Sequence, residues 1–395
     1  MCSMKRLLLS HLTYGQYQQY ARICCWPQQR QAVKLEVPIP SASRQKYRNG
    51  RHVRDENTAA KIVQAILEHR RDPTAPVIHA EAGAGLVCKE FLKNGVTFVI
   101  ALESTKNYLA EHKLLEEEYG SERFHFVQWP MLNLRLKLNM ERVKSSYTQA
   151  EAHVSQLLQQ RTRPGSSHAI FHIGSKVNHE HHDFLFYILR NMPNDDPIIS
   201  PPGVEFFFLA HPRFKSKLEF LANIQKASHS TRFSSILATV YLLYDISFIG
   251  KFHANTFNPS FKTAVAVQDP EWVDPTVRLL VKLKLKDNVD AILPIDHHVN
   301  FSIFLRQIYM KKINRTIPTM EMLVPGCGLR MVALGFTMMD IILRTPPEKL
   351  LLLYKHMISW PEYQSSPLRS FIAQMTHRGG GLWPDNDTMK DEKIL

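Results

Sequence analysis

The chain has 395 residues, of which 44% are hydrophobic, so it is long enough for two domains or for one large core with additions. It carries 49 Lys and Arg against 36 Asp and Glu, and this net charge of +13 favours a polyanionic partner, nucleic acid before membrane. No apolar stretch approaches the roughly 18 residues of a membrane span. The five cysteines form no CxxC pair, which argues against a disulfide scaffold and a structural zinc site.

The N-terminal segment is basic and amphipathic. Residues 1–35 contain five Lys and Arg but no acid, and their apolar run at residues 7–9 is too short for a secretory signal. This composition predicts a mitochondrial transit peptide, and therefore a location in the mitochondrial matrix. Residues 36–43, which include two prolines, are expected to form a linker.

A basic segment opens the predicted α/β core at residue 44. Residues 44–54 include Arg51 and Arg54, which either are solvated or lie along a phosphate backbone. Residues 58–69 are expected to form a helix, because their apolar residues recur at helical spacing.

Residues 77–103 combine an apolar strand, a glycine turn, a helix, a second apolar strand and an acid. The turn reads Glu81-Ala82-Gly83-Ala84-Gly85, and Glu103 ends the second strand. This order is the sequence form of a nucleotide-binding βαβ unit. Glycine allows a ligand to approach the backbone, and an acid at the strand tip can accept hydrogen bonds from a ribose.

Two absences restrict the ligand of this unit. Val87 and Cys88 stand where a dinucleotide fingerprint has its third glycine, and no lysine followed by Ser or Thr marks a phosphate-binding P-loop. An adenosyl ligand without pyrophosphate, such as S-adenosylmethionine, therefore fits better than NAD. The alternative is that the glycines only make a tight turn.

Further strands and helices alternate after Glu103. Helices are expected at residues 108–119, 132–163, 183–190 and 233–249, and strands at 124–127, 169–174, 203–210 and 263–267. This alternation predicts a doubly wound α/β fold with a parallel sheet. Trp129, after the strand at 124–127, could stack on an adenine, although plain packing is the favoured interpretation.

Residues 279–286 alternate with period two and are expected to form an edge strand. Lys282, Lys284 and Lys286 share one face of it, where they either protect the edge from aggregation or bind nucleic acid. From about residue 296 the pattern becomes helical, with helices expected at 300–312, 318–322, 328–343 and 347–356. The predicted divisions are a core at 44–290, a helical domain at 291–376, whose Lys311 and Lys312 are nucleic-acid candidates, and a disordered tail at 377–395.

Histidines crowd the strand at 169–174 and the loop after it. Their spacing matches no zinc motif, so we predict no metal site. The residues concerned are His168, His172, His179, His181 and His182.

The turn, Glu103, the helix at 233–249 and the segment FNPSFKTAVAV at 257–267 together resemble the ribosomal RNA adenine dimethyltransferase family, in particular its mitochondrial branch. The resemblance covers about residues 47–374. It implies a doubly wound S-adenosylmethionine-dependent methyltransferase (Rossmann-like) core with a smaller C-terminal helical domain. The cofactor positions that it implies are Val53, Gly83, Gly85, Glu103 and Trp129. We add Glu81, which opens the glycine turn.

The chain departs from the family at the catalytic motif. The family has Asn, an aliphatic residue, Pro and an aromatic residue after the fourth strand, whereas this chain has Ile173, Gly174, Ser175 and Lys176. Trp129 also replaces the acid that binds the adenine of the cofactor. Without these groups nothing positions a flipped base, so we identify no catalytic residue and expect impaired dimethylation.

Two functions follow from the resemblance. The first is a mitochondrial transcription initiation factor that assists the mitochondrial RNA polymerase in melting promoter DNA. The second is an S-adenosylmethionine-dependent dimethyltransferase that acts on adenines of mitochondrial small-subunit rRNA. Whether the chain is an enzyme stays open at this point.

Overall fold

The computed structural model describes residues 52–103, 108–129, 141–162, 167–173, 182–191, 198–199, 203–222, 231–258, 274, 276–310 and 314–377. The predicted transit peptide, linker and tail, and the predicted strand at 263–267, lie outside these ranges. None of the helices in the described part of the chain is long and apolar enough to cross a membrane.

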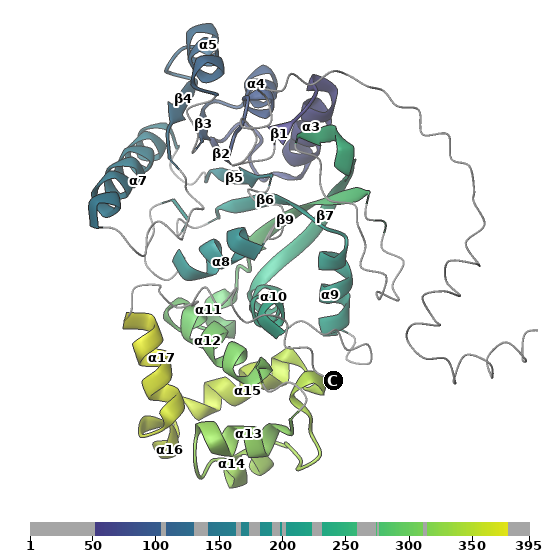
Figure 1. The fold of residues 1–395 in the computed structure, drawn as a ribbon, viewed down its shortest axis with the longest axis vertical. Helices are drawn as coiled ribbons and strands as arrows, with labels where there is room; N and C mark the ends of the chain where they lie inside the picture. The colour runs from purple at the N-terminus through teal and green to yellow at the C-terminus, as the bar shows by residue number, and fades with distance from the viewer. Residues whose placement is uncertain are drawn as a thin grey trace, which may run out of the picture. The chain divides into compact units, whose positions relative to one another are not determined.

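A seven-stranded mixed sheet forms the centre of the core, in the order β4-β3-β2-β5-β6-β9-β7 (Figure 1). Its strands are β2 (Val77–Ala80), β3 (Val99–Leu102), β4 (Phe124–Val127), β5 (Ala169–His172), β6 (Glu205–Ala210), β7 (Tyr244–His253) and β9 (Val277–Leu285). Neighbouring strands from β4 to β6 are parallel, and β9 is antiparallel to both β6 and β7. The predicted doubly wound, Rossmann-like α/β core is confirmed. A separate two-stranded sheet pairs β1 (His52–Val53) with β8 (Phe257–Asn258).

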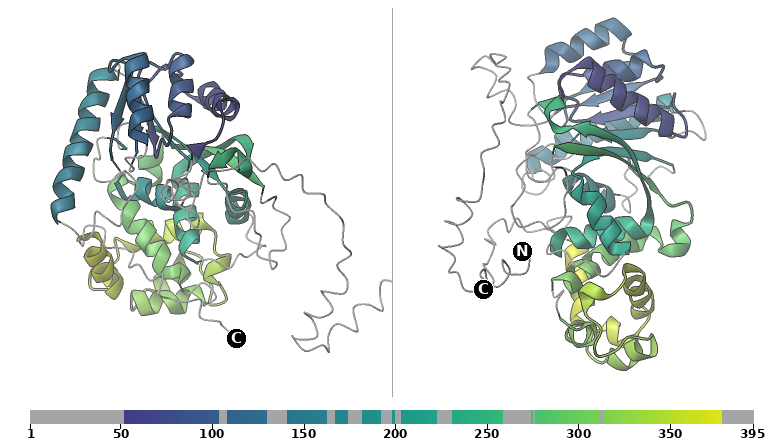
Figure 2. Two further views of the ribbon diagram at one scale, coloured as in Figure 1. Left: turned by 45° about the horizontal axis from the view of Figure 1, so that its top comes forward. Right: turned by 90° about the vertical axis from the view of Figure 1, so that its right-hand side faces the viewer.

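Helices cover both faces of the large sheet (Figures 1 and 2). On one face are α3 (Glu56–His69), α4 (Leu86–Lys93) and α5 (Leu109–Tyr119). On the other are α7 (Glu141–Arg161), α8 (His182–Asn191), α9 (Arg213–Ala222) and α10 (Thr231–Leu243). The central strands are buried on both faces, which explains why they appear in the sequence as continuous apolar runs.

Helix α3 shows how local sequence sets a boundary. The Asp55 carboxylate accepts a hydrogen bond from the backbone N–H of Thr58 at 2.7 Å, which caps the first turn. Ile62, Val63 and Ile66 are fully buried on its inner face. The helix predicted at 58–69 is confirmed, with its start two residues earlier.

Two predictions about the later strands are wrong. Residues 279–286 were expected at an edge, but β9 has antiparallel partners on both sides. The helix expected at 233–249 ends at Leu243, and β7 begins at the next residue. Apolar residues continue through this junction, but beyond Tyr244 they follow the two-residue period of Ile246 and Phe248.

The C-terminal helices are α11 (Val289–Ile292), α12 (His298–Tyr309), α13 (Thr316–Leu323), α14 (Gly328–Ala333), α15 (Pro347–Met357), α16 (Pro361–Gln364) and α17 (Pro367–His377). One hydrophobic cluster runs from the sheet face that α7 to α10 cover into helices α12 and α15. Phe301, Phe304 and Tyr354 are buried in it. The predicted boundary at residue 290 therefore falls inside a continuous core. The helix expected at 328–343 is wrong in extent: α14 ends at Ala333, and Gly335 follows with a φ of +80°.

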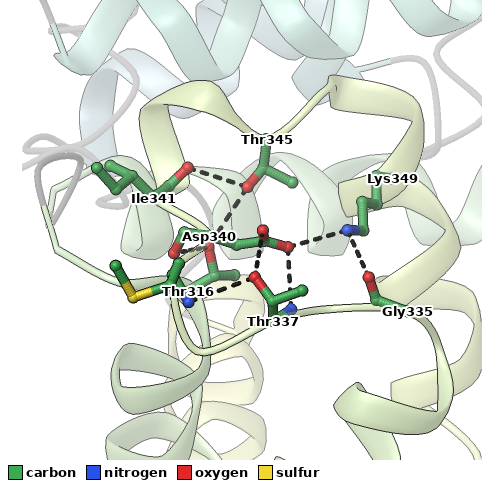
Figure 3. Close-up of polar contacts among 8 residues, drawn as sticks. Thr316, Gly335, Thr337, Asp340, Ile341, Thr345 and Lys349 are labelled. Carbon is green, nitrogen blue, oxygen red and sulfur yellow. Dashed lines mark hydrogen bonds and ion pairs between the residues drawn. The ribbon is translucent and has the colours of Figure 1, made fainter.

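A polar network fixes the loop between α14 and α15 (Figure 3). The Asp340 carboxylate accepts hydrogen bonds from the Thr337 hydroxyl at 2.8 Å and from the Lys349 ammonium at 2.9 Å. The Asp340 carbonyl accepts a bond from the backbone N–H of Thr316 at 2.7 Å, which joins the loop to the start of α13. These hydrogen bonds hold residues 334–346 in place, although the helix expected to continue to residue 343 ends at Ala333.

Candidate functional site: the turn after strand β2

The turn between β2 and α4 has an unusual backbone. Gly83 and Gly85 adopt φ angles of +57° and +80°, and Gly85 is the N-cap residue of α4. Glu81, at +59°, is the only non-glycine residue with positive φ in the described part of the chain, and it is buried. Such a conformation is costly for a residue with a Cβ atom, and it is concentrated at ligand-binding sites.

Glu103 lies directly beside this turn. Strands β2 and β3 are parallel, with Ala80 opposite Leu102, so their carboxyl ends place the turn and Glu103 together. The Glu103 Oε2 atom accepts a hydrogen bond from the backbone N–H of Gly83 at 2.9 Å, and the residue is 1% exposed. A buried carboxylate at this edge suits the hydroxyl groups of a ribose, because it accepts hydrogen bonds and donates none.

A histidine packs on the glycine turn. A Cβ atom added to Gly83 would lie 2.4 Å from the Cβ of His52, so only glycine allows β1 to approach this closely. The His52 Nδ1 atom lies 3.3 Å from the Tyr108 hydroxyl, and burial lowers the pKa of His52. The neutral ring can accept a hydrogen bond from the Tyr108 hydroxyl. Sequence reasoning missed the role of both residues, since no spacing links residue 52 to residue 108.

The structure brings together four of the six predicted cofactor residues: Glu81, Gly83, Gly85 and Glu103. Val53 follows His52 but is 2% exposed and packs in the hydrophobic cluster of the α3 and α4 face. Trp129 is 1% exposed and belongs to the cluster on the opposite face, so its indole has no open face for an adenine. Its position agrees with packing rather than with stacking.

Two buried histidines lie behind the turn. Burial, followed by the neighbouring His172 and His112, lowers the pKa of His79 to about 3, and its Nδ1 atom lies 3.3 Å from Cys88 Sγ. Burial also lowers the pKa of His112 to about 4, and its ring stacks on Phe126 with centroids 4.6 Å apart. Both imidazoles are therefore neutral at physiological pH, and they pack in the core behind the turn.

The histidine-rich strand is built into the core. His168 Nε2 donates to the Ile198 carbonyl at 2.6 Å, and His172 Nδ1 lies 3.4 Å from the Ala80 carbonyl. His179 and His181 lie outside the described residues, and of His182 only the backbone is described. Within the described ranges, no group of three or more His, Cys, Asp or Glu side chains could hold a metal ion.

The predicted place of the catalytic motif follows β5. Ile173 is fully buried. Gly174, Ser175 and Lys176 lie outside the described residues, so the structure gives no geometry for a target base.

Lys282 and Lys284 share one face of β9, and Lys286 directly follows the strand; all three bind partners within the protein. The Lys282 ammonium contacts Glu205 and donates to the His69 carbonyl, each at 2.5 Å. Lys284 pairs with Asp287 at 2.8 Å, and Lys286 donates to the Leu242 carbonyl at 2.8 Å. These amines would have to leave their partners to bind phosphates.

The remaining nucleic-acid candidates lie elsewhere. Arg54 is exposed, and its guanidinium donates to the Asn255 carbonyl at 3.4 Å. Arg51, Lys311 and Lys312 lie outside the described residues. The structure therefore does not unite the predicted basic residues into one surface.

Comparison with known proteins gives similarity of fold alone. No protein-family model matches the chain, and no curated protein matches it. Among solved structures, the chain is similar to the 23S rRNA methyltransferase ErmE, with 15% identity, a TM-score of 0.44 and coverage of 77% of this chain and 98% of that one. It is also similar to a dimethyladenosine transferase from Plasmodium falciparum, with 12% identity, a TM-score of 0.47 and coverage of 77% and 97%. The Rossmann-like fold is assigned from this chain's own strand order and strand directions, not from these similarities.

Proposed function

We propose that this chain binds S-adenosylmethionine at the turn after β2 and works on nucleic acid. The observation that carries the proposal is the contact between the Gly83 N–H and the buried Glu103 carboxylate. It joins the glycine turn to the acid at the end of the neighbouring strand, where a doubly wound sheet binds its ligand. Glu103 would hold the ribose, and the turn at residues 81–85 would hold the methionine part. When bound, the cofactor supplies an activated methyl group.

Glu103→Gln tests cofactor binding. Glutamine keeps an oxygen that can accept the Gly83 hydrogen bond, but it removes the charge that strengthens hydrogen bonds from ribose hydroxyls. We expect roughly a tenfold loss of affinity for S-adenosylmethionine in calorimetric titration, since a hydrogen bond to a charged group contributes about 1.5–3 kcal/mol.

Glu117→Gln is the matched control, because Glu117 is an exposed carboxylate on α5. It should leave the affinity unchanged. If the wild-type protein shows no binding heat and no protection from thermal unfolding at millimolar cofactor, the proposal of a cofactor site is wrong.

We further propose that the chain acts in mitochondria as a transcription initiation factor. Its partners would be the mitochondrial RNA polymerase and melted promoter DNA, and its location the nucleoid of the matrix. Three sequence features support this role: the basic segment at 1–35, the net charge of +13, and the replacement of Asn, Pro and the aromatic residue at positions 173–176. A positively charged, base-tolerant surface is suited to unpaired strands.

The second candidate function is methyl transfer to adenines of mitochondrial small-subunit rRNA. The turn at Gly83 and Gly85 and the buried Glu103 favour it, because a protein that only melts DNA has no need of them. This candidate requires that another group take over the positioning of the target base.

In vitro transcription separates the two candidates. As an initiation factor, the protein should raise runoff transcription by its cognate mitochondrial polymerase on a duplex promoter, and should do so equally with and without S-adenosylmethionine. The Glu103→Gln variant should retain this activity. No stimulation, combined with methyl transfer from labelled cofactor to small-subunit rRNA, would favour the methyltransferase.

A further inference from the structure

Two histidines meet at the edge of the sheet. His125 on β4 and His153 on α7 approach each other with 3.0 Å between their Nε2 atoms. Behind them, the His125 Nδ1 atom lies 3.1 Å from a carboxylate oxygen of Glu116 on α5. The consecutive elements α5 and β4, together with the later helix α7, thus contribute one chain of contacts, Glu116–His125–His153.

The protons in this chain can be assigned from its chemistry. A carboxylate accepts only, so the His125 Nδ1 atom must carry the proton that it donates to Glu116. In the neutral ring, the His125 Nε2 atom then holds a lone pair, and the His153 Nε2 atom donates the shared proton to it.

We propose that His125 and His153 bind a divalent transition-metal cation between their Nε2 atoms. The proton on His153 Nε2 moves through solvent to Nδ1 of the same ring, so that both rings bind the ion as neutral imidazoles. Two imidazoles at tetrahedral angles and about 2.0–2.1 Å from zinc would have Nε2 atoms about 3.3 Å apart. The observed 3.0 Å separation, with ring centroids 5.1 Å apart, is close to that arrangement. Small rotations of the two rings are therefore enough to admit the ion.

Glu116 supports the proposed metal site, because its carboxylate binds the Nδ1 side of the ligand His125. Metal-binding histidines usually donate their other N–H to a carboxylate, which fixes the ring and raises its basicity. Since the described residues offer no third His, Cys, Asp or Glu ligand, water completes the coordination. Such an open site has modest affinity, and the order of binding should place Cu²⁺ ahead of Zn²⁺.

The site would fasten α7 to the edge strand of the sheet. Val154 and Leu158 of α7 are buried in the core, and Arg161 pairs with Glu122 just before β4. A metal between His125 and His153 adds a third attachment, about two turns of α7 before Arg161. Because the ion binds the folded state, it raises stability in proportion to the logarithm of its concentration.

The experiment uses the full chain, stripped of metal and of any histidine tag. We expect titration with Cu²⁺ to give one site whose electron paramagnetic resonance spectrum shows coupling to two imidazole nitrogens, and Zn²⁺ to raise the melting temperature. His153→Gln should lower the affinity at least tenfold and abolish the thermal shift. The exposed His356→Gln is the matched control and should change neither.

Glu116→Gln provides a second arm. It removes the carboxylate behind His125, so the affinity should fall about tenfold while the number of bound ions stays at one. Equal binding by the wild type and His153→Gln, or a wild type without a metal-dependent shift, would reduce the contact to a hydrogen bond between two imidazoles. This inference is independent of the proposed function, because none of its residues lies at the Glu103 site.

Discussion

Acidification from pH 6.5 to pH 4.5 is expected to remove most of the folding stability of this protein. The fully buried histidines His79, His112 and His168 have pKa values lowered by burial to about 3, about 4 and about 4. In the unfolded chain, their pKa values return to near 6.5. Burial lowers the pKa of His52 and His298 in the same direction.

The sign follows from proton binding. Between pH 4.5 and pH 6.5, the unfolded chain binds protons at these histidines and the folded chain does not, so stability falls as the pH falls. The slope per group is at most about 1.4 kcal/mol per pH unit and averages about 1 kcal/mol, because the unfolded ring is only half protonated at pH 6.5. The three groups together therefore contribute about 6–7 kcal/mol over the two units. That sum is comparable to the whole free energy of unfolding of a typical domain, which is about 5–15 kcal/mol.

Urea denaturation at several pH values measures this effect. His79→Gln removes one titrating group, so its unfolding free energy should depend less on pH, by about 1 kcal/mol per unit, whatever its stability at pH 7. The exposed His356→Gln variant should keep the wild-type dependence. A slope that His79→Gln leaves unchanged would mean that the buried ring is protonated in the folded state.

The second large effect is expected from Gly83→Ala. Alanine at a φ of +57° carries a backbone strain of about 1–2 kcal/mol, and its Cβ would lie 2.4 Å from the Cβ of His52. Because the obstructing atom is joined directly to the backbone of β1, it cannot swing aside. Overpacking of this kind adds about 1–3 kcal/mol, so the total loss of stability should be about 3 kcal/mol.

Gly95→Ala isolates the strain. Gly95 also has positive φ, at +86°, but a Cβ there would meet no atom within 4 Å. Its substitution should therefore cost only the backbone term of about 1–2 kcal/mol. Chemical denaturation of both variants gives the comparison. Equal losses would show that β1 moves away from the turn and that His52 is not fixed over Gly83.

The strands and helices of the first half were predictable because their apolar periods are unambiguous. The strand at 77–80 and the glycine turn occur as predicted, since each is specified by residues adjacent in sequence. The second strand, expected at 96–102, begins at Val99 and is followed by Glu103 as predicted. The place of β9 between β6 and β7 was not predictable, because alternation indicates a strand but not its neighbours. Lysines on the strand then suggested an edge, although Lys282 is balanced by the buried Glu205.

The candidate site was predictable to the same extent. Glycines and an acid at strand ends mark Gly83, Gly85 and Glu103 from sequence alone. Contacts between distant segments leave no such mark: His52 reaches Tyr108, and His125 reaches His153, across separations that have no period. Trp129 was a candidate from sequence that the structure places in the core. An aromatic residue at a strand tip can serve a ligand site or a core, and only its burial distinguishes the two.

The hydrophobic cluster shared by the sheet and the C-terminal helices has a consequence for dissecting the molecule. Because α10 packs against α12 within one cluster, a cut near residue 290 would leave both fragments with unprotected apolar surfaces. Each half would then be prone to aggregate by itself, and loss of function in a truncated protein would say little about which half carries the activity.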